Sequence, residues 1–364
     1  MAETWRFIDG GPVDPFANTA RMPIMIKHVA ETGPVLMTSV WGQTHLNVGW
    51  FDDVDSTLDL AACERLGVQV IRRPMYGGGT AFYDEGCAVM CSFLQTKEDA
   101  PDLDAMLSRF QPVYLDALDR IGLGEVQFEG SSDLRWHGRK LGALTGQDIV
   151  AAHSVGSFIN IKPPNLDLYL QVVRVPDDKF KDKVVKDMRE YVVTAQEIAG
   201  REVTYEDYRD ALVGACKDAG MELVDQPFTD EEMATVSRRA QKIADPAYVR
   251  RVSSERFSDD APAGSRVGFG NHKGRKLCRA GVAIDGDNVI AAAMMAGDMH
   301  VGPPDTMDRV ASALVGADAT SADDLRGRIA SVFEGDDVHQ ADAHMGITTD
   351  DLLQAVEKAI ANAG

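Results

Sequence analysis

The sequence predicts an α+β protein with a larger N-terminal domain built on a mixed β-sheet and a smaller α+β domain at the C-terminus. Apolar runs typical of strands interleave with helical periodicity without a strict strand–helix–strand order, which favours a mixed sheet over a doubly wound one. The 364 residues, 45% of them apolar, suffice for two cores. A polar segment with proline and glycine, residues 253–264, is the predicted linker between residues 1–252 and 265–364.

The N-terminal half begins with alternating strand and helix patterns. A long amphipathic helix is predicted for residues 103–121, with apolar side chains at i, i+3 and i+4 spacing, and Pro112 should kink or split it. The run from Leu168 to Val175 alternates weakly and precedes Pro176, so it is predicted to be a strand. The other elements expected here are a strand at 6–9, a helix at 14–31, strands at 35–40 and 44–49, and a helix at 58–66.

The C-terminal half contains helical patterns around a predicted hairpin. Residues 276–284 and 288–296 are predicted strands joined by the turn Asp285-Gly286-Asp287. The predicted helices are residues 230–243, 305–315 and 349–361, the last capped by Thr348 or Thr349.

Charge separates this chain from an ordinary acidic protein. It has 57 acidic and 37 basic residues, a net charge of −20, with 40 Asp against 17 Glu and 24 Arg against 13 Lys. Molar salt shortens the Debye length to about 3 Å and would relieve the repulsion, so the bias indicates a salt-accumulating host. A merely acidic mesophilic enzyme is the alternative.

The same composition argues against several classes of partner. There is no basic stripe that would bind nucleic acid, and no apolar stretch long enough to span a membrane. The N-terminus lacks a charged-then-apolar leader, so a cytoplasmic location is expected. Five cysteines without paired spacing fit free thiols and make a zinc site unlikely.

A glycine-rich segment is the most informative part of the sequence. Gly77, Gly78 and Gly79 follow the basic residues Arg72 and Arg73, with Tyr76 directly before the glycines. Without Cβ atoms, the backbone N–H groups of such a run are open to a ligand, and two guanidiniums beside them suit an anion or an acyl phosphate. A glycine-rich hairpin with solvated arginines is the alternative.

A second segment pairs a carboxylate with a lysine. Asp133 and Lys140 are seven positions apart on two predicted short strands joined by a turn at Trp136–Gly138, which brings their side chains close together. A carboxylate can hold magnesium, and a lysine can neutralise phosphate. Taken alone, the two residues would more often form a surface ion pair.

In their order, these blocks resemble the lipoate-protein ligase A family, and the resemblance covers nearly the whole chain. The segments that carry it, besides the two above, are residues 156–161, 187–194, 205–220 and 273–297. The resemblance implies a catalytic domain of the biotin/lipoate ligase type followed by an accessory domain. The chain departs from the family pattern where Tyr76 precedes the glycines, where Tyr83-Asp84 replaces His-Asp, and where Ser132 replaces Asn.

The resemblance implies an ATP-dependent ligase that converts lipoic acid to lipoyl-adenylate and transfers the lipoyl group to a lysine of an acceptor domain. It assigns catalysis to Lys140 and Mg²⁺ binding to Asp133. The implied acceptors are lipoyl domains of 2-oxoacid dehydrogenase E2 subunits and the glycine cleavage H protein. Substrate and ATP contacts are assigned to Arg72, Arg73, Tyr76, Gly77, Gly78, Gly79, Tyr83, Asp84, Arg139 and Gly142.

Two other functions stay open at this stage. A cofactor-free octanoyl- or lipoyl-transferase would need a cysteine nucleophile, and Cys87 and Cys91 are the cysteines near the glycines. A non-catalytic relative that binds lipoyl domains would explain the altered positions around the glycine run. The sequence leaves the acyl chain, the acceptor and the oligomeric state undetermined.

Overall fold

The computed structural model describes residues 3–74, 79–100, 102–130, 132–149, 152–174, 189–340 and 346–363. The chain divides into two compact units, each made of several chain segments. Unit 1 contains residues 1–45, 82–170 and 175–242, and unit 2 contains residues 46–81, 171–174 and 243–364.

Unit 1 is built on a mixed eight-stranded sheet in the order β11-β1-β2-β6-β10-β9-β8-β7. β1 pairs in parallel with β2 and β11, and the pairs from β2 through β7 are antiparallel. The strands are β1 (Glu3–Val13), β2 (Val35–Trp41), β6 (Ala88–Thr96), β7 (Gln127–Glu129), β8 (Asp133–Trp136), β9 (Arg139–Ile149), β10 (Ala152–Asn160) and β11 (Met221–Asp225).

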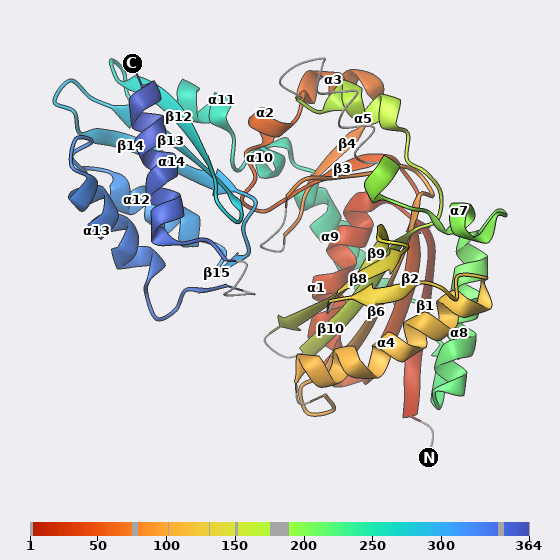
Figure 1. Ribbon diagram of the computed structural model, residues 1–364. Helices are drawn as coiled ribbons and strands as arrows, with labels where there is room; N and C mark the ends of the chain where they lie inside the picture. The colour runs from red at the N-terminus through yellow and green to blue at the C-terminus, as the bar shows by residue number, and fades with distance from the viewer. Residues whose placement is uncertain are drawn as a thin grey trace. The chain divides into compact units, whose positions relative to one another are not determined.

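Helices cover both faces of this sheet (Figure 1). α4 (Leu103–Arg120) and α8 (Tyr205–Asp218) pack against one face, where Trp5, Phe93 and Phe110 form the centre of the larger core. α1 (Pro15–Thr32) packs on the opposite face through a smaller apolar cluster. The other helices of unit 1 are α5 (Leu166–Val172), α7 (Ala195–Ala199) and α9 (Asp230–Ile243); α5 and α9 each end in unit 2.

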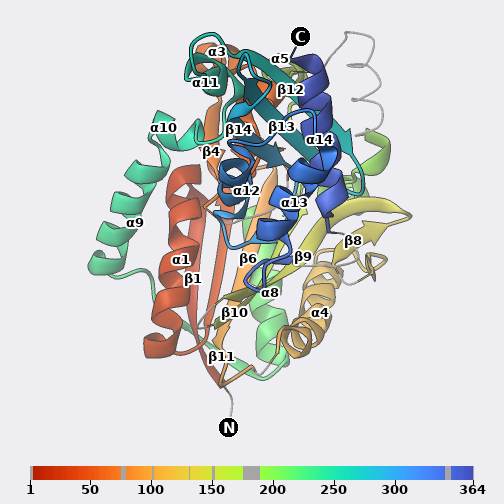
Figure 2. The same cartoon turned by 90° about the vertical axis from the view of Figure 1, so that its left-hand side faces the viewer.

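Unit 2 contains a three-stranded antiparallel sheet and a layer of helices on it (Figure 2). Its strands are β12 (Arg266–Lys273), β13 (Leu277–Ile284) and β14 (Ile290–Gly297), in that order. α12 (Thr306–Leu314), α13 (Ala322–Phe333) and α14 (Thr349–Asn362) bury their apolar faces in the core of this unit. β15 (Val301–Gly302) pairs with β16 (His339–Gln340).

Residues 46–81 belong to unit 2, which differs from the predicted boundaries. Phe51 is buried in the same core as the helices of unit 2, and its carbonyl accepts a hydrogen bond from the Gly297 N–H. Residues 1–252, predicted as one domain, are therefore divided between the two units. The predicted linker, residues 253–264, contains α11 (Ser254–Asp259), and Ser253 is buried. The remaining helices are α2 (Val54–Thr57), α3 (Leu60–Leu66) and α10 (Pro246–Val249). A further three-stranded sheet has the order β4 (Gln69–Arg72), β3 (His45–Val48) and β5 (Ala81–Tyr83).

Most predicted elements are confirmed within a few residues, including the hairpin of β13 and β14 and the helix cap at Thr348. The strand predicted at 168–175 is wrong, because α5 occupies most of it. The Asn165 side chain accepts a hydrogen bond from the Leu168 N–H and so starts this helix. α4 continues through Pro112 as a single helix.

The α+β fold with a mixed sheet is confirmed. Among the described residues, no helix is long and apolar enough to cross a membrane.

Candidate functional site

The predicted pairing of Asp133 with Lys140 is present in unit 1. The turn between β8 and β9 has positive φ at His137 and Gly138, and it folds the two strands into a hairpin. Lys140 Nζ lies 2.8 Å from Asp133 Oδ1, and the two side chains are 25% and 23% exposed. The ammonium is therefore fixed by a carboxylate yet open to an incoming anion.

Arg135 is a third member of this cluster and is not among the site residues predicted from the sequence. Asp133 and Arg135 are two residues apart on β8, and Arg135 lies opposite Lys140 on β9, so the three side chains share one face of the sheet. Arg135 Nη2 lies 2.9 Å from Asp133 Oδ2. Leu134, between them, is buried against α4 and α8 on the other face. Alternation on β8 was the sequence signal for this placement.

The carboxylate of Asp133 binds two cationic side chains, those of Lys140 and Arg135. Burial raises its pKa, but the hydrogen bonds and charges of Lys140 and Arg135 outweigh burial and lower the pKa below the usual value. The described residues contain no group of three or more His, Cys, Asp or Glu side chains arranged for a metal ion. The predicted Mg²⁺ site at Asp133 therefore does not fit the residues in place. Both Asp133 oxygens bind a cationic side chain, and the carboxylate of Glu129, opposite Asp133 on β7, is itself paired with Arg135.

Arg139 and Gly142 have structural roles on β9. Arg139 binds the Glu197 carboxylate and donates to the carbonyls of Arg189 and Val192, so it ties residues 189–197 to the sheet. A Cβ on Gly142 would lie 2.0 Å from the Phe158 carbonyl oxygen, so only glycine allows β9 and β10 to approach this closely. Arg139 uses both terminal nitrogens for these contacts, and its buried Nε has no hydrogen-bond partner among the described residues.

Tyr83 and Asp84 lie near the end of β2, where the Tyr83 ring contacts Trp41. The Tyr83 ring stacks on His45 at 5.3 Å between centroids and meets Phe158 of β10 edge-on. Asp84 accepts hydrogen bonds from the Thr44 hydroxyl and from the Asn165 N–H at 3.1 Å. Its carboxylate thus joins two loops.

Arg73, Gly79 and Thr80, at the two ends of the glycine-rich segment, belong to unit 2. Arg73 donates to the Gly79 carbonyl at 2.8 Å and to the Asn47 carbonyl at 3.0 Å, which closes the base of the loop. Thr80, the next residue, donates to Asp52 at 2.8 Å. Tyr76, Gly77 and Gly78 lie outside the described residues.

Arg72 is buried and saturated by backbone carbonyls, so it is not available to a phosphate. Its guanidinium donates to the carbonyls of residues 49, 50, 52, 249 and 252, and the side chain has no exposed area. The predicted substrate role is corrected to a structural one, because the guanidinium hydrogen-bonds to backbone carbonyls through Nε, Nη1 and Nη2. Its partners are 20 to 180 residues away in the sequence, which left no local signal.

All five cysteines are buried free thiols: Cys63, Cys87, Cys91, Cys216 and Cys278. Burial raises the pKa of Cys87 to about 11, and its sulfur accepts the Asp84 N–H at 3.1 Å. Cys91 lies within 3.2 Å of the hydroxyls of Tyr114 and Tyr208 in the core, and burial raises its pKa as well. Neither thiol is in the exposed, electropositive setting that activates a nucleophilic cysteine.

Comparison with known proteins identifies the family of this chain. The family described as lipoyl protein ligase A/B catalytic domain matches residues 14–217, more than half of the sequence. The chain belongs to this family. This bears out the lipoate-protein ligase resemblance and the biotin/lipoate ligase type of the fold.

Relatives of this ligase-family chain differ in their reactions. An octanoyltransferase, LipM, of Geobacillus kaustophilus is 25% identical over 71% of this chain and 97% of its own length. The bipartite lipoate protein ligase of Thermoplasma acidophilum, studied with its E2 lipoyl domain, has a TM-score of 0.58 at 19% identity over 69% of this chain and 97% of its own. Plasmodium falciparum LipL1 in complex with lipoate has a TM-score of 0.67 at 13% identity over 97% of this chain and 99% of its own.

Proposed function

We propose that this protein is an ATP-dependent lipoate-protein ligase that attaches a lipoyl group to a lysine of an acceptor lipoyl domain. The observation that carries the proposal is Lys140: a partly exposed ammonium, held 2.8 Å from Asp133, on a chain whose cysteines are all buried. Candidate acceptors are E2 lipoyl domains, as in the Thermoplasma system, and the H protein. The cytoplasmic location and the salt-rich host stay predictions, as do the absence of nucleic-acid and membrane partners.

The reaction would take place in two steps. A carboxylate oxygen of lipoic acid attacks the α-phosphorus of ATP, and pyrophosphate leaves. The acceptor amine then attacks the acyl carbon of lipoyl-adenylate, AMP leaves with the electrons of the broken C–O bond, and the amine loses a proton. Negative charge develops on phosphate oxygens in the first step and on the carbonyl oxygen in the second. A compact ammonium at Lys140 would stabilise both.

Magnesium would reach such a site bound to ATP, since Mg²⁺ in nucleotide enzymes is commonly held by phosphates with one or two carboxylates. Asp133 is not assigned to it here. Arg73 and Gly79 remain candidates for contacts with the adenylate, because the Arg73 side chain forms the base of the glycine run.

A thiol-dependent octanoyltransferase is the second candidate, favoured by the reaction named for the Geobacillus relative. Such an enzyme would take the octanoyl group from a thioester donor onto a cysteine, releasing the donor thiol, and the acceptor amine would then displace the cysteine thiolate without ATP. The burial of Cys87 and Cys91 argues against it. A non-catalytic relative that only binds lipoyl domains is the third candidate.

The first prediction tests the reaction itself. We expect intact mass spectrometry of an acceptor lipoyl domain to show the lipoyl increment only when lipoate, ATP and Mg²⁺ are all present, in buffer of low and of molar potassium chloride. Octanoyl-carrier protein without ATP serves as the parallel donor. Modification from that donor alone would establish the transferase, and no modification with any donor would leave the binding relative.

The second prediction concerns Cys87→Ser. Because serine nearly preserves the volume of a buried side chain that has no chemical role, we expect the ligase activity of the variant to stay within about threefold of wild type. Cys91→Ser provides a second test. An inactive Cys87→Ser protein with a wild-type melting temperature, together with a thioester trapped on wild type, would contradict the ligase proposal.

A further inference from the structure

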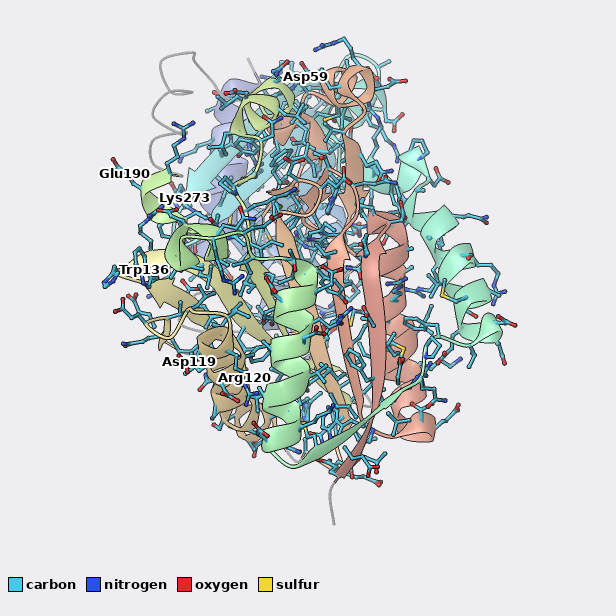
Figure 3. The ribbon with its side chains drawn as sticks, turned by 90° about the vertical axis from the view of Figure 1, so that its right-hand side faces the viewer. Asp59, Asp119, Arg120, Trp136, Glu190 and Lys273 are labelled. Atoms are coloured by element: carbon cyan, nitrogen blue, oxygen red, sulfur yellow. The ribbon has the colours of Figure 1, made fainter. Side chains whose placement is uncertain are left out.

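A hollow of about 630 Å³ opens beside the hairpin that carries Asp133. Its walls come from unit 1, and the side chains that matter are those of Glu125, Gln127, Glu129, Arg135 and His137. In Figure 3, Trp136 marks the end of β8, where this hairpin reaches solvent. β7 is the last strand of the eight-stranded sheet, so the hollow lies at an open sheet edge.

Three residues that line the hollow, Gln127, Glu129 and Arg135, lie on the face of the sheet that carries Lys140. Gln127 on β7 is opposite Arg135 on β8, and Arg135 is opposite Lys140 on β9. Glu129 is likewise opposite Asp133. Side chains paired directly across antiparallel strands project to one side, so a polar surface continues from the edge strand to the ammonium of Lys140.

Arg135 joins the hollow to the Lys140 cluster. It lines the hollow, and its Nε lies 3.1 Å from Glu129 while Nη2 binds Asp133. Its guanidinium also stacks over the Tyr191 ring at 5.2 Å. Tyr191 is 49% exposed and is one of four large apolar side chains exposed among the described residues. Exposed tyrosine and arginine side chains are typical anchors of protein interfaces.

We propose that this surface docks the acceptor domain and presents its lysine to the Lys140 site. We call it the acceptor-docking face and define it by Glu125, Gln127, Glu129, Arg135 and Tyr191. The inference rests on the proposed function. Its occupant is a folded lipoyl domain: Glu125 and Glu129 complement the charge of its acceptor lysine, and Tyr191 supplies the apolar contact.

The test separates docking from chemistry through two variants that leave Arg135 and its partners in place. Glu125→Arg reverses the charge of a carboxylate whose described partner is His137, at 3.1 Å, and Gln127→Trp fills the hollow. We expect each to raise the KM for a recombinant E2 lipoyl domain tenfold or more. Lipoyl-adenylate formation and transfer of the lipoyl group to hydroxylamine, a nucleophile too small to need docking, should stay at wild-type rates.

The matched control is Glu222→Arg on β11, an exposed glutamate at the opposite edge of the same sheet, which should change none of these quantities. Wild-type KM in both docking variants, or an equal fall in adenylate formation, in transfer to hydroxylamine and in transfer to the lipoyl domain, overturns the proposal. Titration calorimetry of the lipoyl domain against each variant without ATP measures docking directly. A wild-type protein that forms no adenylate therefore refutes the ligase function while this binding result still decides the docking face.

Discussion

Replacing Lys140 by alanine is expected to reduce both half-reactions at least a hundredfold. The described partner of the Lys140 ammonium is the Asp133 carboxylate, at 2.8 Å, whereas the neighbouring Arg135 and Arg139 also bind backbone carbonyls. A ligand can therefore reach this ammonium without breaking a backbone hydrogen bond. Removing a charge that stabilises the transition state costs about 3 kcal/mol, which corresponds to a rate loss of roughly a hundredfold or more. Pyrophosphate release with lipoate and ATP measures the first step, and transfer from synthetic lipoyl-adenylate measures the second.

Two variants control this experiment. Lys217→Ala removes an exposed lysine of α8 in the same unit and should leave both rates unchanged. Lys140→Arg keeps the charge but replaces a compact ammonium with a planar guanidinium, so partial activity is expected. The melting temperature of Lys140→Ala should stay near wild type, because Asp133 keeps Arg135 as its counter-ion. Rates within threefold of wild type in both assays would remove Lys140 from the mechanism.

The Lys140 hairpin could be predicted because its signals are local. A short turn ending in glycine fixes the strand pairing, and the pairing places residues 133 and 140 together within a few positions of the turn. Side chains of β8 alternate between the two faces of the sheet. Because Leu134 is buried on one face, the same alternation predicts Arg135 on the other face, with Lys140.

The division into units could not be predicted in this way. Phe51 is apolar in any fold, and the sequence around it does not say that it packs with β13 and α14 more than two hundred residues later. The helix α5 illustrates a different failure. The weak alternation of apolar residues in 168–175 is typical of a strand. The Asn165 side chain, however, caps a helix by accepting the Leu168 N–H.

Replacing Arg72 by methionine is expected to produce the largest loss of stability. The guanidinium lies at the junction of residues 49–52 with residues 249–252, and its Nε and Nη2 both donate to Val249, at 2.9 and 2.8 Å. Methionine keeps much of the volume but leaves the buried carbonyls of Asp52 and Val249 without this donor, while the Gly49 carbonyl keeps the Asp52 N–H at 3.2 Å. Each unsatisfied buried group costs about 1–3 kcal/mol, so we expect a total loss of about 4 kcal/mol or more.

Hydrogen exchange followed peptide by peptide is the suitable measurement, because the two units need not unfold together. We expect faster exchange in peptides covering residues 46–72 and 243–253, with the sheet of unit 1 protected as in wild type. Arg256→Met provides the same substitution at an arginine whose side chain is 60% exposed and pairs with Asp260 one helical turn away, and it should change stability by no more than about 0.5 kcal/mol. Arg72→Lys retains the charge with fewer donors and should fall between the two. If Arg72→Met exchanged like Arg256→Met, the carbonyls would have found other donors, and Arg72 would again be a candidate for binding phosphate.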